Sequence, residues 1–260
     1  MAFHRLRANV TIVESALLAG FPHGFTTRRG GASSPPFDGL NLGGLVGDDP
    51  ARVAENWAFV ERETGLTFAR ARQVHGAGVL RAAGPSEPAE EADVVVSRTA
   101  GVAACVSVAD CVPVLVADPE TGAVAAVHAG WRGTLARAAA EGVAALAAET
   151  GTPAGAMLAA VGPSIGPCCY EISEELAARF ASDIGGDLVR RDPGPKLDLW
   201  AANVAILRAA GVEDGRIEVL GRCTACERDL FFSHRRDAGR TGRNIAFIAP
   251  RPPTGGGPLP

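Results

Sequence analysis

Apolar positions recur along the chain with two spacings, one typical of strands and one typical of helices. Short runs rich in branched apolar residues predict strands at positions 10–13, 67–73, 94–97, 102–108, 157–161, 217–220 and 245–249. A helix is predicted to begin at Pro50, after the N-cap Asp49, and to end at Gly65. Further helices are predicted over residues 131–150, from 173 onward and over 197–210.

The clearest predicted element is a β-hairpin in the middle of the chain. Two apolar runs, Val112–Ala117 and Ala123–Val127, flank the turn sequence DPETG at 118–122. Cys111 precedes the first run and His128 follows the second, so the folded hairpin brings both to its open end. Residues that face each other across an antiparallel pair have Cβ atoms about 5 Å apart. A thiol and an imidazole are therefore predicted side by side where the strands stop.

The order of elements predicts one domain with mixed sheets. Strands alternate with helices, but the hairpin interrupts the alternation, which favours a mixed-sheet α/β or α+β fold over a purely parallel sheet. We find no internal repeat and no linker, so residues 1–249 are predicted to form a single domain. The Pro/Gly-rich tail, 250–260, is predicted to be disordered.

One turn-rich segment, 24–47, is longer than most connections between elements. It is either a surface loop or a loop that carries Arg28, Ser33 and Asn41 towards a ligand.

Composition and charge exclude several classes of partner. The chain has 260 residues, of which 47 % are hydrophobic, enough for a substantial core. A net charge of −4 gives no electrostatic reason to expect nucleic acid or an anionic membrane as a partner. The N-terminus lacks a signal peptide and no apolar run reaches about 18 residues, so we expect a cytoplasmic protein. Its six cysteines are then expected to be reduced, which favours thiol or metal roles over disulfides.

Candidate chemistry gathers around the open end of the hairpin. Cys111 and His128, joined by His75, would supply three ligands and one open position, as in catalytic zinc sites. Only Cys111 and His128 are brought together by local sequence; His75, which follows the strand predicted at 67–73, needs a tertiary contact. The same residues fit a metal-free alternative, in which Cys111 is a nucleophile, His128 its base and Asp110 or another acid the orienting group.

Two other motifs have weaker interpretations. Cys223 and Cys226 form a CxxC, but a zinc ribbon needs a second pair at matching spacing, and Cys168-Cys169 do not provide it. A thioredoxin-like βαβ context is also not evident, so neither a metal nor a redox role is expected for this motif. The segment 162–166 (GPSIG) is either a tight strand-to-helix turn or a backbone cradle for phosphate.

Several motifs together resemble a known family. They are RQVHG (72–76), ADCVPVL (109–115), HAGWRG (128–133), VGPSIGPCCYEI (161–172), LDLWAAN (197–203), CTAC (223–226), FFSHRRD (231–237) and TGRN (241–244). The segment 26–50 is similar to the family's N-terminal signature, so the resemblance covers about residues 20–249. These proteins were first described as laccase-like multicopper polyphenol oxidoreductases, then as peptidoglycan editing factors and more recently as purine nucleoside phosphorylases.

The resemblance implies a fold, a cofactor and a reaction. The expected fold is a single α/β domain similar in its site to the Cys/His toxin deamidases. Zinc would be held by His75, Cys111 and His128. The enzyme would use phosphate to split adenosine, inosine, guanosine and 5′-methylthioadenosine into base and sugar 1-phosphate, and would also deaminate adenosine to inosine. The family's substrate-facing positions would be Arg28, Asn41, Arg72 and Arg132.

Counting imidazoles argues against copper oxidase chemistry. A blue-copper centre alone uses two histidines and one cysteine, and further coppers need several more histidines. The chain has five histidines in all, two of them at positions 4 and 23. We therefore expect zinc in preference to copper. Two other hypotheses stay open at this point: a Cys/His amide hydrolase that edits peptidoglycan precursors, and a binding protein without catalysis.

Overall fold

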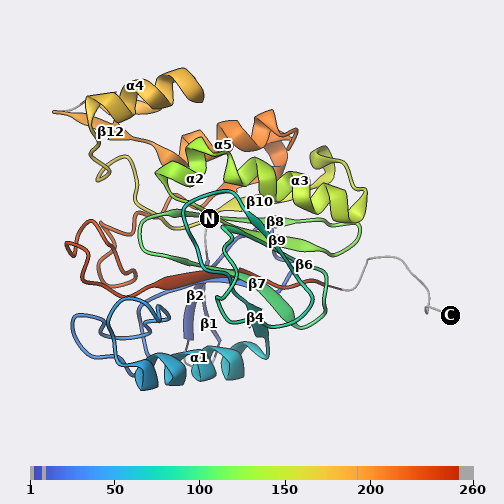
Figure 1. Ribbon diagram of the computed structural model, residues 1–260, viewed down its shortest axis with the longest axis vertical. Coiled ribbons are helices and arrows are strands. Elements are labelled where there is room, and N and C mark those ends of the chain that lie inside the picture. Colours follow the sequence, from blue (N-terminus) through green and yellow to red (C-terminus); the bar gives the residue numbers. More distant parts are fainter. Residues whose placement is uncertain (1–2, 8–9, 192, 252–260) are drawn as a thin grey trace.

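The computed structural model of the chain describes residues 3–7, 10–191 and 193–251. Two six-stranded sheets pack face to face, and helices cover the outer face of each sheet (Figure 1). Helix α1 (Pro50–Thr64) lies on the first sheet, whereas α2 (Trp131–Leu135), α3 (Ala138–Thr150) and α5 (Leu199–Ala209) lie on the second. The predicted mixed α/β single domain is confirmed.

The first sheet collects strands from both ends of the chain. Its order is β1 (Phe3–Arg7), β2 (Val10–Glu14), β3 (His23–Thr26), β14 (Asn244–Ile248), β7 (Val102–Val108) and β4 (Thr67–Ala69). All neighbours are antiparallel except β4 and β7, which are parallel.

The second sheet contains the predicted hairpin. Its order is β13 (Ile217–Val219), β10 (Leu158–Val161), β8 (Val112–Ala117), β9 (Val124–Ala129), β6 (Val94–Ser97) and β5 (Val79–Ala82). The hairpin strands β8 and β9 lie at the centre, and parallel pairs β10–β13 and β5–β6 form the two edges. A separate two-stranded sheet joins β11 (Val189–Arg191) and β12 (Pro195–Leu197) beside α4 (Glu174–Asp183).

Side chains of the central strands alternate between two buried layers. In β7, Val102, Ala104 and Val106 point between the sheets, whereas Ala103 and Cys105 pack under α1. Successive side chains of a strand point to opposite faces, so a strand buried on both faces needs an unbroken apolar run. This explains why the central strands were recognisable from sequence although they lack polar alternation.

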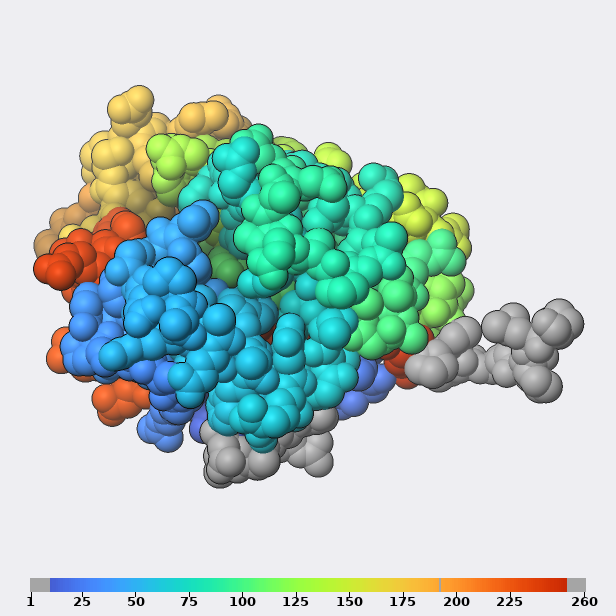
Figure 2. Space-filling model, turned by 60° about the horizontal axis from the view of Figure 1, so that its bottom comes forward, coloured from blue at the N-terminus to red at the C-terminus, as the bar shows by residue number. Residues whose placement is uncertain are grey.

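Helix α1 begins and ends where the sequence predicted. The Asp49 side chain accepts a hydrogen bond from the Ala51 backbone N–H at 2.9 Å, and Gly65 closes the helix in the left-handed conformation. One face buries Trp57, whose ring meets Phe68 of β4 edge-on with centroids 5.4 Å apart. The outer face of α1, which points away from the sheet, is part of the molecular surface turned towards the viewer in Figure 2.

Several predicted boundaries were wrong. The helix predicted over 131–150 is two helices, α2 and α3, because Arg137 between them adopts a positive φ of 59°. The strand predicted at 67–73 stops at Ala69, after which the chain becomes a loop. Strands β1, β3, β5, β11 and β12 were not predicted, since they are short and lack a distinctive apolar run.

One residue of the predicted Pro/Gly-rich tail, Arg251, contacts the rest of the domain. Arg251 is held against the β8–β9 turn, where its backbone N–H donates to Gly122 O at 3.2 Å and its Nη2 to Pro119 O at 2.9 Å. The rest of the predicted tail, 252–260, lies outside the described residues. Among those described, no helix has the length and apolar character required to cross a bilayer.

Candidate metal centre

Cys111, His128 and His75 meet at one end of the second sheet, and we call these three residues the His/Cys centre. Cys111 lies directly before β8, and His128 lies in β9 opposite Pro113, as the hairpin predicts. His75 comes from the loop between β4 and β5. The tertiary contact that the sequence could not provide is therefore present in the fold.

The spacing of the three side chains suits one shared metal ion. Their ligand atoms all lie within 4.8 Å of one another. Cys111 Sγ is 4.0 Å from His75 Nε2, and the two imidazole rings meet edge-on with centroids 4.9 Å apart. In a tetrahedral zinc site, bonds of about 2.3 Å to sulfur and 2.0–2.1 Å to nitrogen separate such ligand atoms by about 3.5 Å. The residues present therefore fit a metal ion with little adjustment.

A buried carboxylate, Asp93, orients both histidines. It lies directly before β6, and its Oδ1 accepts hydrogen bonds from His128 Nδ1 at 2.7 Å and from the His75 backbone N–H at 3.0 Å. Its Oδ2 accepts from the backbone N–H groups of Val74 and Gly76. A proton fixed on His128 Nδ1 leaves Nε2 as the free lone pair, which is the arrangement found behind metal-bound histidines.

The backbone around the centre is strained at two positions and tightly packed at a third. His75 and Asp110 have φ values of 62° and 87°, in the region that residues other than glycine rarely adopt. Gly130, two residues after His128, leaves space for the ligands: a Cβ there would lie 2.8 Å from Cys111 Sγ and 3.2 Å from His75 Cδ2. The sequence between β9 and α2 therefore requires glycine at this position.

Charge in the centre favours a thiolate beside an imidazolium when no metal is present. Burial opposes the charged form of Cys111, but its attraction to His128 outweighs burial and lowers the pKa of the thiol. Burial likewise opposes a charge on His128, but Cys111 and Asp93 outweigh it and raise the pKa of the imidazole. Burial alone would raise the pKa of Asp93, yet the hydrogen bonds it accepts lower it. Asp93 therefore stays ionised.

Asp110, the acid that the metal-free alternative names first, does not orient His128. Its Oδ1 accepts a hydrogen bond from Thr224 Oγ1 at 2.7 Å and its Oδ2 from the Arg235 backbone N–H at 2.6 Å. The orienting acid is Asp93, which sequence analysis missed. Asp110 instead ties the turn before Cys111 to the loop that follows β13.

The four predicted substrate residues occupy different environments. Arg132, in the first turn of α2, is exposed and stacks on the Trp131 ring at 4.3 Å. Arg72 pairs with Glu91 at 2.6 Å. Arg28 pairs with Asp38 at 2.9 Å and lies over the Phe232 ring.

Asn41 has a structural environment. Its side chain is fully buried, its Nδ2 donates to Asp48 Oδ2 at 2.8 Å, and its Oδ1 accepts from the backbone N–H groups of Gly43 and Arg243. These bonds fasten the long 24–47 segment to the start of β14, and they occupy both ends of the amide.

Three polar residues near Cys111 were not predicted. Tyr170 is buried, and burial together with the charges of Cys111 and Asp110 raises its pKa to about 12, against opposing effects of Arg235 and Arg132. The Arg235 guanidinium lies over the Tyr170 ring at 5.0 Å. Burial lowers the pKa of Arg243, and this is partly offset by Cys111 and Asp110. Arg235 and Arg243 lie in the FFSHRRD and TGRN motifs, and Tyr170 lies in VGPSIGPCCYEI, but one sequence cannot separate site residues from structural ones.

The segment 162–166 is a strand-to-helix connection and not a phosphate cradle. Its four backbone N–H groups donate to partners within the protein: Gly162 to Pro113 O, Ser164 to Arg222 O, Ile165 to Asp110 O and Gly166 to Cys223 Sγ. No amide of this turn is left for an anion. Of the two interpretations that the sequence allowed, the tight turn is correct.

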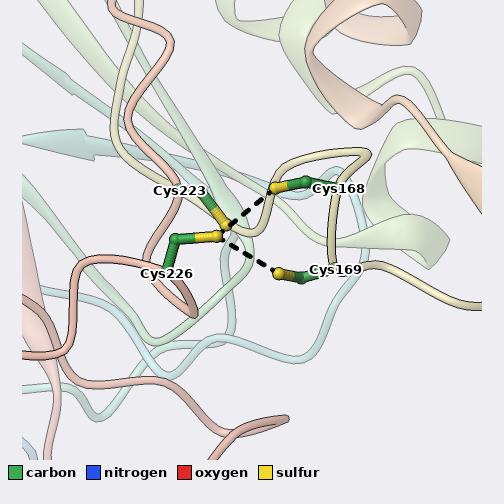
Figure 3. Close-up of side chains that lie close together, drawn as sticks. All are labelled: Cys168, Cys169, Cys223 and Cys226. Carbon is green, nitrogen blue, oxygen red and sulfur yellow. Dashed lines mark hydrogen bonds between the residues drawn. The ribbon is translucent and has the colours of Figure 1, made fainter.

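The expectation that Cys168-Cys169 would not complement the CxxC motif was wrong. The sulfur atoms of Cys168, Cys169, Cys223 and Cys226, which we call the cysteine cluster, all lie within 4.8 Å of one another (Figure 3). Linear spacing hid this arrangement, because the two pairs are more than fifty residues apart and meet only through the pairing of β10 with β13.

A family model described as "Multi-copper polyphenol oxidoreductase laccase" matches residues 22–251 of the chain. The chain belongs to this family. The laccase-like relatives include proteins named purine nucleoside phosphorylase. The one from Deinococcus radiodurans is 45 % identical over 231 residues, covering 87 % of this chain and 88 % of the relative. The one from Geobacillus stearothermophilus, YlmD, is 38 % identical over 250 residues, covering 90 % of this chain and 91 % of the relative.

Solved structures of similar proteins share the fold. The crystal structure of YlmD from Geobacillus stearothermophilus matches with a TM-score of 0.89 at 34 % identity, covering 96 % of this chain and all of that chain. A hypothetical protein from Bacillus licheniformis, YfiH, matches with a TM-score of 0.87 at 32 % identity, covering 95 % and 99 %. The two-sheet architecture is therefore the architecture of the family.

Proposed function

We propose that the chain is a zinc-dependent purine nucleoside phosphorylase. The reaction would break the bond between the ribose C1′ and the purine nitrogen and form a bond from C1′ to a phosphate oxygen, giving free base and ribose 1-phosphate. The observation that carries this proposal is the His/Cys centre, backed by the buried carboxylate of Asp93, in a chain similar over most of its length to proteins named purine nucleoside phosphorylase.

The donor set favours zinc over copper. His75, Cys111 and His128 would hold the ion and leave one position for substrate or water. A blue-copper centre adds a weak axial methionine, but Met157, the only methionine in the described residues, is fully buried in the core under α3 and α5. When bound, zinc would supply a Lewis acid and lower the pKa of coordinated water.

The chain's own residues would bind and orient the reactants. Asp93 holds a proton on His128 Nδ1, so the ring keeps one tautomer and one orientation. Tyr170, with a pKa raised to about 12, stays protonated and can donate a hydrogen bond to the base or the ribose. No hydrogen bond or ion pair holds the Arg132 guanidinium within the described part of the chain, so its charge is available to the phosphate nucleophile.

Adenosine deamination is the finer part of the proposal. The same centre would replace the C6 amino group of adenosine with oxygen from water, giving inosine and ammonia. Zinc deaminases carry out this reaction with a His/Cys donor set and an acid/base residue that is not a ligand. Adenosine bound with its C6 edge at the His/Cys centre would be deaminated, and adenosine bound with its ribose C1′ there would undergo phosphorolysis.

A nucleoside product assay tests the proposal. Purified zinc-loaded protein is incubated with adenosine, with and without phosphate, and the products are separated by chromatography. We expect adenine and ribose 1-phosphate only when phosphate is present, inosine in both conditions, and neither product with Cys111→Ser. Failure of the zinc-loaded protein to form adenine from adenosine and phosphate would refute the phosphorylase assignment.

One observation favours a second candidate, a metal-independent amide hydrolase acting on peptidoglycan precursors. Cys111, His128 and Asp93 form a chain of thiol, imidazole and carboxylate, as in cysteine hydrolases. Exhaustive chelation distinguishes the two candidates. Amidase activity that persists without metal and is lost on alkylation of Cys111 would support the hydrolase, whereas nucleoside phosphorolysis that returns only with zinc would support the phosphorylase.

We also infer a cytoplasmic site of action. Nucleosides and phosphate are cytoplasmic metabolites, and the six described cysteines are all unpaired thiols. Fractionation of cells that produce the protein, with activity followed in each fraction, tests this inference.

A further inference from the structure

The cysteine cluster lies apart from the His/Cys centre and uses four different residues. Cys168 and Cys169 belong to the turn between β10 and α4, and Cys223 and Cys226 belong to the loop after β13. Figure 3 shows the four side chains pointing toward one another from these two segments. No residue of the His/Cys centre takes part, so the question of what the cluster binds is independent of the proposed reaction.

Sheet pairing fixes the two segments side by side. Strands β10 and β13 are parallel neighbours, so the chain leaves both strands at the same edge of the sheet. The pairing continues beyond the strands through a bridge between Ser164 and Cys223. There the Ser164 N–H donates to Arg222 O at 3.1 Å and the Thr224 N–H donates to Ser164 O at 3.0 Å. The cluster is therefore preorganised by backbone hydrogen bonds rather than by chance contact of flexible side chains.

Sulfur separations match a metal site and not a pair of disulfides. Cys226 Sγ lies 3.6 Å from Cys168 Sγ and 3.4 Å from Cys169 Sγ. Four thiolates around one zinc, at about 2.3 Å each, would be about 3.8 Å apart. A disulfide requires about 2.05 Å. All four cysteines are free thiols in the structure, so each can offer one sulfur to a shared ion.

A sulfur atom of the cysteine cluster accepts a hydrogen bond from a backbone amide. The Gly166 N–H donates to Cys223 Sγ at 3.3 Å. Hydrogen bonds of this kind stabilise thiolate ligands and set their orientation around a metal. A side chain at Gly166 would meet the Trp200 ring, since a Cβ there would lie 2.7 Å from it, so glycine lets the turn approach both the tryptophan and the sulfur.

We infer that Cys168, Cys169, Cys223 and Cys226 bind a second zinc ion as a closed tetrathiolate site. Binding would release the four thiol protons to solvent and leave no coordination position for substrate, which is the arrangement of structural zinc. Soft thiolate ligands select zinc over calcium, magnesium or manganese.

The ion would clamp the two loops that support Asp110. Ile165, three residues before Cys168, donates its N–H to Asp110 O at 2.9 Å, and Thr224, next to Cys223, donates its hydroxyl to the Asp110 carboxylate. Asp110 carries the strained φ of 87° directly before Cys111. Fixing the loops would hold this strain in place, so the second ion would stabilise the geometry of the first centre without touching substrate.

Metal counting on matched variants tests the inference. Protein produced with zinc is desalted, and zinc per chain is measured for the unsubstituted protein, Cys226→Ser, Cys111→Ser and Cys105→Ala. Cys105 is a buried thiol that belongs to neither site, so its variant is the control for loss of a cysteine. We expect two zinc ions in the unsubstituted protein and in Cys105→Ala, and one in each of the other two variants.

Replacing zinc with cobalt gives an absorption spectrum that reports the ligands of the ion. This measurement requires neither enzyme activity nor a comparison of the stabilities of the variants. Cobalt-loaded Cys111→Ser is expected to show the intense visible bands and strong near-ultraviolet charge transfer of four thiolates on one tetrahedral ion. Circular dichroism verifies that each variant is folded. A cobalt spectrum that is lost in Cys111→Ser but kept in Cys226→Ser would overturn the inference, as would a metal-free cluster whose mass shows the hydrogen loss of two disulfides.

Discussion

The His/Cys centre and the cysteine cluster both border Asp110, which precedes Cys111 and accepts a hydrogen bond from Thr224 beside Cys223, but they are built in opposite ways. The first has three ligands of two kinds, a buried carboxylate behind them and strained backbone at His75 and Asp110. The second has four ligands of one kind, backbone N–H donors from Gly166 and Cys226 to Cys223 Sγ, and turns that follow paired strands. Strain and an incomplete donor set are typical of sites that react, whereas a complete donor set is typical of sites that hold a fold together.

This contrast predicts opposite consequences for the loss of one sulfur. Cys111→Ser should reduce phosphorolysis to below about one thousandth, a larger loss than the 10–100-fold typical of changes behind a ligand, with a modest change in melting temperature. Cys226→Ser should do the reverse, with a clear fall in melting temperature and a smaller loss of activity. Steady-state kinetics and thermal unfolding on both variants check this. If both variants lost activity and stability in equal proportion, the assignment of a reactive role to the His/Cys centre and a structural role to the cysteine cluster would be wrong.

The carboxylate behind the first centre should have the next largest effect. Asp93→Asn keeps the size of the side chain but removes the charge that fixes the His128 tautomer, so we expect a 10–100-fold loss of zinc affinity or activity. The matched control is Asp118→Asn, since Asp118 is equally buried but holds the β8–β9 turn through Thr121 Oγ1 at 2.7 Å. Zinc titration of both variants measures the effect. If Asp93→Asn and Asp118→Asn bound zinc with equal affinity, Asp93 would have no role in orienting the ligands of the His/Cys centre.

Close packing around Cys111 should have a smaller but specific effect. Gly130→Ala places a methyl group 2.8 Å from Cys111 Sγ. This contact can be relieved only if a ligand moves, so we expect zinc affinity at the His/Cys centre to fall about tenfold. That loss equals about 1.4 kcal/mol, which is within the usual cost of overpacking. Gly84→Ala is the control, because nothing lies within 4 Å of a Cβ at Gly84. An unchanged affinity in Gly130→Ala would mean that the ligands sit further apart than described.

The sequence predicted the parts of the molecule that depend on local contacts. The hairpin that joins Cys111 to His128 follows from two apolar runs and one turn, and the α1 boundaries follow from Asp49 and Gly65. Each set of signals spans fewer than twenty residues of the chain, about 17 from Cys111 to His128 and 16 from Asp49 to Gly65, so they need no knowledge of the fold.

The missed features depend on contacts between distant segments. Asp93 lies 35 residues from His128, and Cys169 lies 57 residues from Cys226. In both cases the partners meet only because particular strands pair, β6 with β9 and β10 with β13. A single sequence predicts that strands exist but rarely which strands pair, so it could name only the nearer acid, Asp110, and left the orienting role open to another acid.

The smallest predicted effect tests whether the two centres are coupled. Thr224→Val keeps the shape of the side chain but removes the hydroxyl that donates to Asp110 at 2.7 Å. A buried carboxylate oxygen without this partner should lower the free energy of unfolding by about 1–3 kcal/mol. Because Asp110 precedes Cys111, we also expect a reduction of kcat of about threefold, the equivalent of about 0.7 kcal/mol in the barrier, while zinc in the cysteine cluster stays unchanged.

A hydroxyl in α1, the helix on the first sheet, provides the reference for this effect. Thr64→Val, in the last turn of α1, also removes a hydrogen bond, from Thr64 Oγ1 to Val60 O at 2.7 Å, but it contacts neither centre. Thr64→Val should therefore lower stability without changing kcat. If Thr224→Val and Thr64→Val gave the same kcat, the hydrogen bond from Thr224 to Asp110 would not affect the position of Cys111. The two centres would then be functionally independent of each other.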